Sequence, residues 1–231
     1  MSQRDDWAAR TEQQLLDAAL RLAVHQGWTW PTVREAGKAV GLTASETELL
    51  VPSGPRDLAA LLSRRLDDEA LDSLTGLDPA AMKVRERIRS AVAAWLRAAQ
   101  ADESAVRRWV GFLALPANLG LGLRLAWASA DVLWRWAGDV AADENHYTKR
   151  ALLAEILISS LAISMTAGQG AALAHLDRRI AGVMAFEKAK ARFKPIEGLR
   201  RAAEGLGRLR YRGTPREQDL LPAPPSEVSF D

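Results

Sequence analysis

The chain has 231 residues, enough for one large domain or two small ones with a buried core. It contains no cysteine, which excludes a disulfide framework and a cysteine nucleophile, and its three histidines lack metal-site spacing, so we expect no metal. The net charge is only +2, but residues 186–216 hold ten Lys or Arg against three Glu, which indicates an anionic partner for this segment.

The N-terminal third predicts four short helices. The first ten residues, MSQRDDWAAR, lack the apolar stretch of a signal peptide, so we expect none. A broad apolar face predicts a first helix over 11–26, which Gly27 ends. The sequence TVRE at 32–35 predicts a capping box that opens the second helix.

The third helix has two possible caps, Thr43 with Glu46 or Ser45 with Glu48, and a fourth helix is expected over 57–74. This order resembles the N-terminal domain of TetR-type regulators over about the first 70 residues.

The third helix nevertheless lacks the chemistry that a DNA-reading helix needs. A DNA-binding module must neutralise phosphates. The third helix offers Glu46 and Glu48 instead, and no Lys or Arg occurs from Thr43 to Pro55. We therefore expect no DNA binding and interpret this helix as retained for packing, although Arg34, Lys38 and Arg56 lie nearby in the sequence.

The rest of the chain also reads as helix, because strand signals are nearly missing. Residues 147–165 are apolar nearly all round, which predicts a buried central helix. The uncharged run 156–176 loses its strongly apolar character near Met165, too early for a membrane span. The predicted helices cover residues 84–99, 109–136 with a break at Pro116, 147–165 and 171–194.

We therefore predict an all-α fold, a TetR-like helical bundle in three parts. Residues 1–77 form a helix-turn-helix-like domain, and residues 78–194, beyond Asp78-Pro79, form a larger helical ligand domain. Residues 195–231 hold a basic amphipathic helix and a proline-rich tail.

Residues 137–150, AGDVAADENHYTKR, carry the most specific pattern, followed by the apolar ALLAEILISS. With LALPANLGLGLRLAWASADVLWRW before it and LDRRIAGVM after it, the match spans about residues 105–190. This region resembles the coenzyme Q (ubiquinone) biosynthesis accessory family of lipid-binding proteins with a TetR-like fold.

The resemblance implies a non-enzymatic protein without a cofactor. It would bind a polyprenylated ubiquinone precursor or a phospholipid and assist the di-iron demethoxyubiquinone hydroxylase. The same resemblance implies a homodimer and a cytoplasmic protein that is peripheral on the inner membrane.

The resemblance also places the contact with the hydroxylase around the AGD…YTKR segment. The residues themselves allow another interpretation, in which Asp139, Asp143 and Arg150 form structural ion pairs and a helix cap. Tyr147 fits either a core or an interface, and Glu155 stands close to the expected buried face. The predicted partner-binding residues are Asp139, Asp143, Asn145, His146, Tyr147, Lys149 and Arg150.

A lipid-binding cavity is plausible between the segments 109–136 and 151–165, which are dense in Leu, Trp and Phe. Gly120 and Gly122 leave space there, and Pro116 interrupts the helix where a mouth could open. Plain core packing is the simpler explanation for any single one of these side chains. The predicted lipid-binding residues are Trp109, Phe112, Leu115, Leu119, Leu123, Trp127, Leu133, Leu152 and Ile156.

The segment 196–212 combines apolar residues at helical spacing with five arginines. Such a segment is typical of a helix that folds on an anionic membrane surface. The alternative is a solvated basic tail, or one that binds nucleic acid weakly. The predicted membrane-binding residues are Ile196, Leu199, Arg200, Arg201, Leu206 and Leu209.

The sequence holds no nucleophile elbow, phosphate-binding loop or dinucleotide fingerprint, so we expect no enzyme. A ligand-responsive transcription regulator of the TetR type is the main alternative function. A second alternative is an interaction scaffold that binds no ligand.

Overall fold

The computed structural model describes residues 3–139 and 144–192, and the side chains of residues 7–139 and 147–185. These residues contain helices and no strand, which confirms the all-α prediction. The chain divides into a compact unit up to Gly182 and a second unit from Val183, which is described only as far as Arg192.

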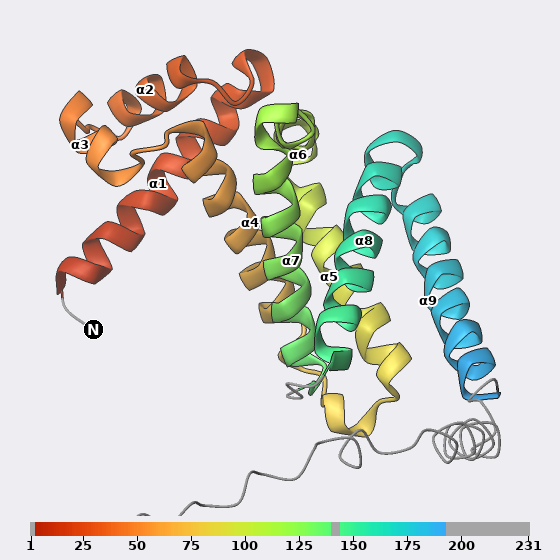
Figure 1. Ribbon diagram of the computed structural model, residues 1–231. Coiled ribbons are helices and arrows are strands. Elements are labelled where there is room, and N and C mark those ends of the chain that lie inside the picture. Colours follow the sequence, from red (N-terminus) through yellow and green to blue (C-terminus); the bar gives the residue numbers. More distant parts are fainter. Residues whose placement is uncertain (1–2, 140–143, 193–231) are drawn as a thin grey trace, which may run out of the picture. The chain divides into compact units, whose positions relative to one another are not determined.

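The first four helices follow one another with short connections (Figure 1). α1 packs along α2 and also contacts α4 and α6, and α3 packs on α2. The helices are α1 (Gln3–Gln26), α2 (Trp30–Ala39), α3 (Ala44–Leu50) and α4 (Pro55–Asp72).

The remaining helices form the larger part of the compact unit. α7 lies between α4 and α8 and packs along both, as Figure 1 shows. The elements are η1 (Pro79–Ala81), α5 (Val84–Ala101), α6 (Glu103–Leu113), η2 (Pro116–Asn118), α7 (Leu119–Trp136), α8 (Glu144–Ala167) and α9 (Gln169–Arg192).

The start of α2 differs from the prediction. The N-cap is Thr29, whose hydroxyl accepts from the backbone N–H of Thr32, and Pro31 occupies the first turn. Proline is tolerated there because the first helical N–H groups have no partner within the helix. The capping box expected at 32–35 is therefore wrong, and the buried Thr32 hydroxyl instead donates to the Gly27 carbonyl at 2.8 Å.

The start of α3 settles the choice between two caps. The Thr43 hydroxyl accepts from the Glu46 backbone N–H, and the Glu46 carboxylate accepts from the Thr43 backbone N–H at 2.8 Å. The Glu46 carboxylate also accepts from the Thr43 hydroxyl, and the bonds from the Thr43 backbone N–H and hydroxyl lower the pKa of Glu46. One of the two acidic residues of α3 is thus a capping residue, as the packing interpretation expects.

The core of the compact unit runs continuously from α1 to α9. Leu62 of α4, Leu96 of α5 and Leu133 of α7 are fully buried in it, as are Leu157 and Leu176 from the last two helices. α4 and α5, which lie on opposite sides of the predicted domain boundary at residue 78, pack on each other. The boundary itself stays a prediction.

The chain bends by 91° between α6 and the η2–α7 segment. Pro116 opens η2, and the buried Asn118 side chain donates to the Phe112 carbonyl at 3.1 Å across the bend. Proline ends the preceding helix because it lacks an N–H and restricts the residue before it. The break expected at Pro116 is confirmed.

α8 is only half buried, so the prediction of a helix buried all round is wrong. Leu153, Leu157 and Leu161 face the core, whereas Ala151, Ile158 and other residues on the opposite face are exposed. By length and composition alone, Tyr147–Ala167 is the one described helix that could cross a membrane, and half of its apolar window is buried here. A core helix of a folded protein meets the same criterion.

The part of α9 within the compact unit is attached by polar contacts as well as by Leu176. Arg89 of α5 forms an ion pair with Asp177 at 2.6 Å. On α8, Ser159 hydrogen-bonds His175 at 2.9 Å, and Glu155 pairs with Arg179. Glu155 is exposed rather than close to a buried face, which corrects the expectation for this residue.

Candidate functional site

A cavity of about 190 Å³ lies between α4, α5, α6, α7 and α8. The bend at Pro116 turns the chain at this place, so α6 and α7 border the same space from two directions. The lining is almost entirely apolar. The lining residues are Ser63, Trp95, Trp109, Val110, Leu113, Ala114, Leu119, Gly122, Leu123, Leu125, Ala126, Ser129, Leu157, Ile158 and Leu161.

The cavity has an open and a closed end, which differ in exposure. Leu119, Leu123 and Ile158 are 53%, 55% and 45% exposed, so they form the rim where the cavity meets solvent. Ser63 and Ser129 are 2% and 1% exposed and form the closed end together with the equally buried Trp95, Trp109 and Leu157. Exposed large apolar side chains around a concave site are a common sign of a binding surface.

Three of the predicted lipid-binding residues, Trp109, Leu119 and Leu123, line this cavity. Leu133 and Ile156 are instead buried in the core. The other predicted residues are also absent from the lining: Phe112 packs against the core, Leu115 is exposed, Trp127 lies beside Tyr147, and Leu152 is half-buried. Their assignment to lipid stays a prediction that this cavity does not support.

The sequence prediction missed several apolar lining residues, among them Val110, Leu113 and Leu161. On α7 five of the six lining residues recur at helical spacing, with Leu125 as the sixth: Leu119, Gly122, Leu123, Ala126 and Ser129. One helix face therefore borders the cavity, and the 3.6-residue period was the signal that could have separated it from the core face.

A buried carboxylate lies behind the closed end. Asp67 of α4 is 6% exposed and accepts a hydrogen bond from Trp95 Nε1 at 2.8 Å. Burial raises the pKa of Asp67 to about 6, while hydrogen bonds from Ser129 and Trp95 act in the opposite direction. No sequence signal pointed to this group, because Asp67-Asp68 looks like an ordinary exposed pair on a helix.

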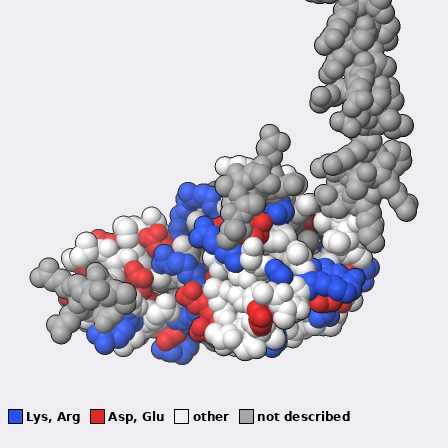
Figure 2. All heavy atoms as spheres, turned by 90° about the horizontal axis from the view of Figure 1, so that it is seen from below, with Lys and Arg blue, Asp and Glu red and all other residues white. Residues whose placement is uncertain are grey.

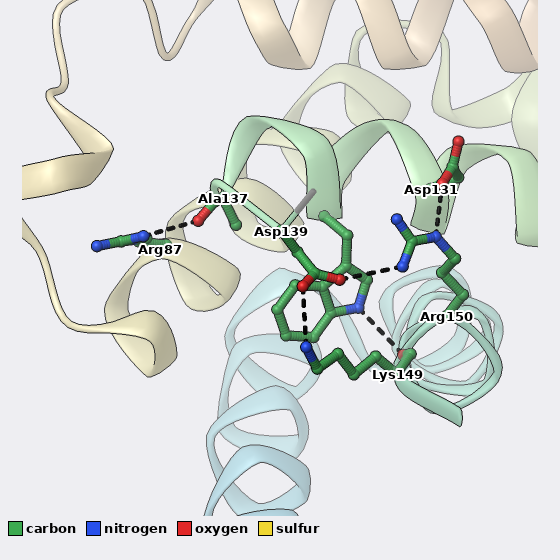
Figure 3. Close-up of polar contacts among 7 residues, drawn as sticks. Arg87, Asp131, Ala137, Asp139, Lys149 and Arg150 are labelled. Carbon is green, nitrogen blue, oxygen red and sulfur yellow. Dashed lines mark hydrogen bonds and ion pairs between the residues drawn. The ribbon is translucent and has the colours of Figure 1, made fainter. Parts of the chain in front are cut away.

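A second polar cluster joins the end of α7 to the start of α8. Arg150 donates to Asp131 at 2.5 Å and to Asp139 at 3.1 Å, and Lys149 donates to Asp139 at 2.9 Å. Figure 3 shows Asp139 between the side chains of Lys149 and Arg150. Burial opposes ionisation of Asp139, but these cations outweigh it and hold its pKa below the ordinary value.

Arg150 does not project outward, because its side chain is only 2% exposed. Arg150 and Asp139 therefore form an ion pair within the structure, as the alternative interpretation of this segment expects. Lys149 is 35% exposed and its ammonium lies 5.7 Å from the centre of the Trp134 ring. Tyr147 is 67% exposed and its ring lies 6.2 Å from that of Trp127.

Several predicted site residues lie outside what the structure describes. Asp143 is one of them, and for Asn145 and His146 only the backbone, at the start of α8, is described. All the predicted membrane-binding residues also lie outside: Ile196, Leu199, Arg200, Arg201, Leu206 and Leu209. Within the described side chains, no group of three His, Asp or Glu could hold a metal ion.

The comparisons with known proteins agree on one family. The model of the COQ9 family matches residues 119–187, which include α7, α8 and the rim leucines of the cavity. The mitochondrial ubiquinone biosynthesis protein COQ9 of Homo sapiens is 29% identical over 153 residues, which are 63% of this chain and 48% of the human protein.

Two other mitochondrial relatives give the same result. The COQ9 protein of Bos taurus is 29% identical over 153 residues, covering 63% of this chain and 47% of its own. COQ9-A of Xenopus laevis is 29% identical over 154 residues, covering 63% and 48%. The chain thus spans about half the length of the curated relatives it matches.

Proposed function

We propose that the protein serves ubiquinone biosynthesis as a non-enzymatic carrier of a polyprenylated ring compound, because residues 119–187 match the model of the COQ9 family. The observation that carries this proposal is the apolar cavity between α6, α7 and α8, whose rim leucines are half exposed. Burying apolar surface contributes about 25 cal/mol per Å². A ligand that covers the rim as well as filling the cavity would gain binding free energy from both contacts.

The carrier would work beside an enzyme that modifies the ring. We propose that the surface around Tyr147 and Lys149 contacts the di-iron hydroxylase of the pathway. The ion pairs of Arg150 with Asp131 and Asp139 support this assignment, because they hold the first turns of α8, which carry this surface, against the end of α7. The exposed Tyr147 ring supplies apolar area of the kind that is enriched at interfaces.

The carrier would load from and unload to a membrane. We propose that residues 196–212, with arginines beside leucines, dock reversibly on the anionic surface of the inner membrane. A homodimer is proposed on the same family grounds. Replacing Leu199 and Leu206 with Asp should abolish sedimentation with anionic liposomes, and unchanged sedimentation would remove the docking role.

Mass spectrometry of lipid extracted from the purified protein tests the carrier proposal. The wild type should carry an isoprenoid compound, and Ala126→Phe should carry much less, because Ala126 lines the cavity. Ala128→Phe is the matched control, since Ala128 lies on the same helix but is exposed and outside the lining. Leu123→Asp, at the exposed rim, gives a second test that does not strain the core.

Absence of lipid from the wild type, or equal lipid in both Phe variants, would contradict the carrier proposal. It would favour the scaffold without a ligand.

The rival function is a ligand-responsive regulator of the TetR type. The close packing of α3 on α2 favours it, since Gly37 leaves room for Thr47 between the two helices. The charges do not, because α3 contains no Lys or Arg. Figure 2 shows the molecule from below, away from α3, and on that face basic and acidic side chains are interspersed. Sequence-selective gel shift at moderate salt would support the regulator and count against the carrier.

A further inference from the structure

The closed end of the cavity holds two serine hydroxyls, although the rest of its lining is apolar. The hydroxyls of Ser63 and Ser129 lie there, 3.5 Å apart, and the residues are 2% and 1% exposed. A direct hydrogen bond between two hydroxyls is usually about 2.7–2.8 Å long. Each hydroxyl can donate once and accept twice. Ser129 also donates to Asp67, so the pair offers a ligand atom the Ser63 proton and the remaining acceptor capacity of both oxygens.

The other donors around the cavity already have partners. Trp95 Nε1 donates to Asp67 at 2.8 Å, and Trp109 Nε1 donates to the Ala59 carbonyl at 3.1 Å. Two indole rings therefore present apolar faces or edges to the cavity while their N–H groups bond elsewhere. The serine hydroxyls are what the described lining offers to a polar ligand atom.

The volume decides which part of a ligand fits. An apolar cavity of about 150 Å³ in another protein binds benzene. The cavity here, about 190 Å³, is therefore large enough for one substituted six-membered ring. It is smaller than the roughly 300–1,000 Å³ of whole-ligand pockets, so a long polyprenyl chain cannot lie inside it.

The charges decide which ring substituents fit. The lining residues include no Lys or Arg, and the Asp67 carboxyl lies just behind the serines. Burying an anion without a partner cation costs several kcal/mol or more. A phosphate or carboxylate is therefore excluded from the closed end, whereas a neutral hydroxyl or carbonyl is accepted.

We propose that the closed end binds the ring of a neutral phenol or quinone, with Ser63 and Ser129 hydrogen-bonding a ring oxygen, and that the tail leaves over Leu119, Leu123 and Ile158. The ligand thus enters ring first. This inference rests on the proposed carrier function and adds the orientation and the chemical class of the head group.

The test compares two probes that differ by one hydroxyl, 4-nonylphenol and nonylbenzene, by displacement of a fluorescent lipid from the full chain. Wild type should bind both. The double variant Ser63→Ala with Ser129→Ala should weaken 4-nonylphenol about tenfold and change nonylbenzene less than twofold, because a buried hydroxyl then lacks partners. Ser73→Ala, exposed and outside the lining, should change neither.

The outcomes separate this inference from the function on which it rests. If wild type binds both probes and the double serine variant weakens both equally, or weakens neither, the ring-first orientation is overturned and the carrier function still stands. Failure of the wild type to bind either probe would overturn both. Should dodecanoate bind as tightly as 4-nonylphenol, the exclusion of anions from the closed end would be wrong, and the orientation with it.

Discussion

Arg150 of α8 donates to Asp131 of α7 at 2.5 Å and does so with a side chain that is 2% exposed. The same guanidinium bonds Asp139, beyond the end of α7. One buried cation therefore joins two carboxylates across the connection between two helices. Burying charges costs desolvation, so such a cluster contributes more to a defined geometry than to net stability.

Replacing Arg150 with Met should destabilise the protein by about 2–3 kcal/mol, because Asp131 and Asp139 lose a buried partner and keep only the more exposed Arg135 and Lys149. Methionine keeps much of the side-chain volume, so the loss measures the charge rather than a cavity. Urea denaturation followed by circular dichroism gives the free energy of unfolding.

Arg135 provides the matched control, since it pairs with the same Asp131 at 2.5 Å but is 72% exposed. Arg135→Met should cost less than about 1 kcal/mol, as exposed ion pairs do. Equal losses of unfolding free energy in the two variants would show that burial does not account for the contribution of Arg150 to stability.

Asp67 should make the protein less stable as the pH rises from about 4 to 6. Its pKa is raised by burial from 3.8 to about 6, and Asp68 acts in the same direction, so the folded state binds more protons than the unfolded state in this window. Loss of this proton therefore favours unfolding, by at most about 3 kcal/mol.

Asp67→Asn should remove this loss of stability while keeping an acceptor for Trp95. The stability difference from wild type should therefore grow between about pH 4 and 6 and stay constant above that window. Asp72→Asn, on the same helix and exposed, should keep the wild-type slope. Parallel urea curves for wild type and Asp67→Asn from pH 4 to 7 would contradict the raised pKa.

Asp139 should behave in the opposite way. Burial raises its pKa, but the bonds from Lys149 and Arg150 lower it more, so the net pKa lies below 3.8. Its contribution to stability is present above that value and is lost as the pH falls through the folded-state pKa. Carbon-detected NMR titration should show Asp139 ionised at pH 3.8, and Lys149→Met should raise its pKa.

The helices themselves were predictable from apolar periodicity and from glycine and proline. Gly27, which ends α1, has φ 71°, and Pro116 lies at the bend, both as expected. The start of α2 was missed because two threonines precede the apolar positions. The choice of Thr29 over Thr32 depends on Pro31 in the first turn, a signal that the sequence does contain.

The candidate site was predictable as a region and not as a set of side chains. Trp109 and Leu133 look equally apolar in sequence, yet only Trp109 borders the cavity while Leu133 lies in the core. Which face of α7 meets the cavity depends on how α4 and α8 pack on it, and these contacts join residues far apart in the chain. The burial of Arg150 depends on the same packing.

Gly37 should be required for the packing of α3 on α2. A Cβ at this position would lie 2.3 Å from Thr47 Oγ1, and Thr47 is buried and donates to the Thr43 carbonyl. Gly37→Ala should therefore cost about 1–3 kcal/mol, because overpacking forces a shift between the helices. Gly111→Ala, in α6 with open space around it, should be neutral or stabilise by up to about 1 kcal/mol.

A double variant separates this clash from a general effect of alanine. Thr47→Ala alone removes a hydrogen bond and should destabilise, but it also removes the atoms that a Cβ added at Gly37 would meet. The two substitutions together should therefore cost less than the sum of the two alone, by about 1 kcal/mol in a double-mutant cycle of unfolding free energies. Strict additivity would show that the two helices do not meet at these residues.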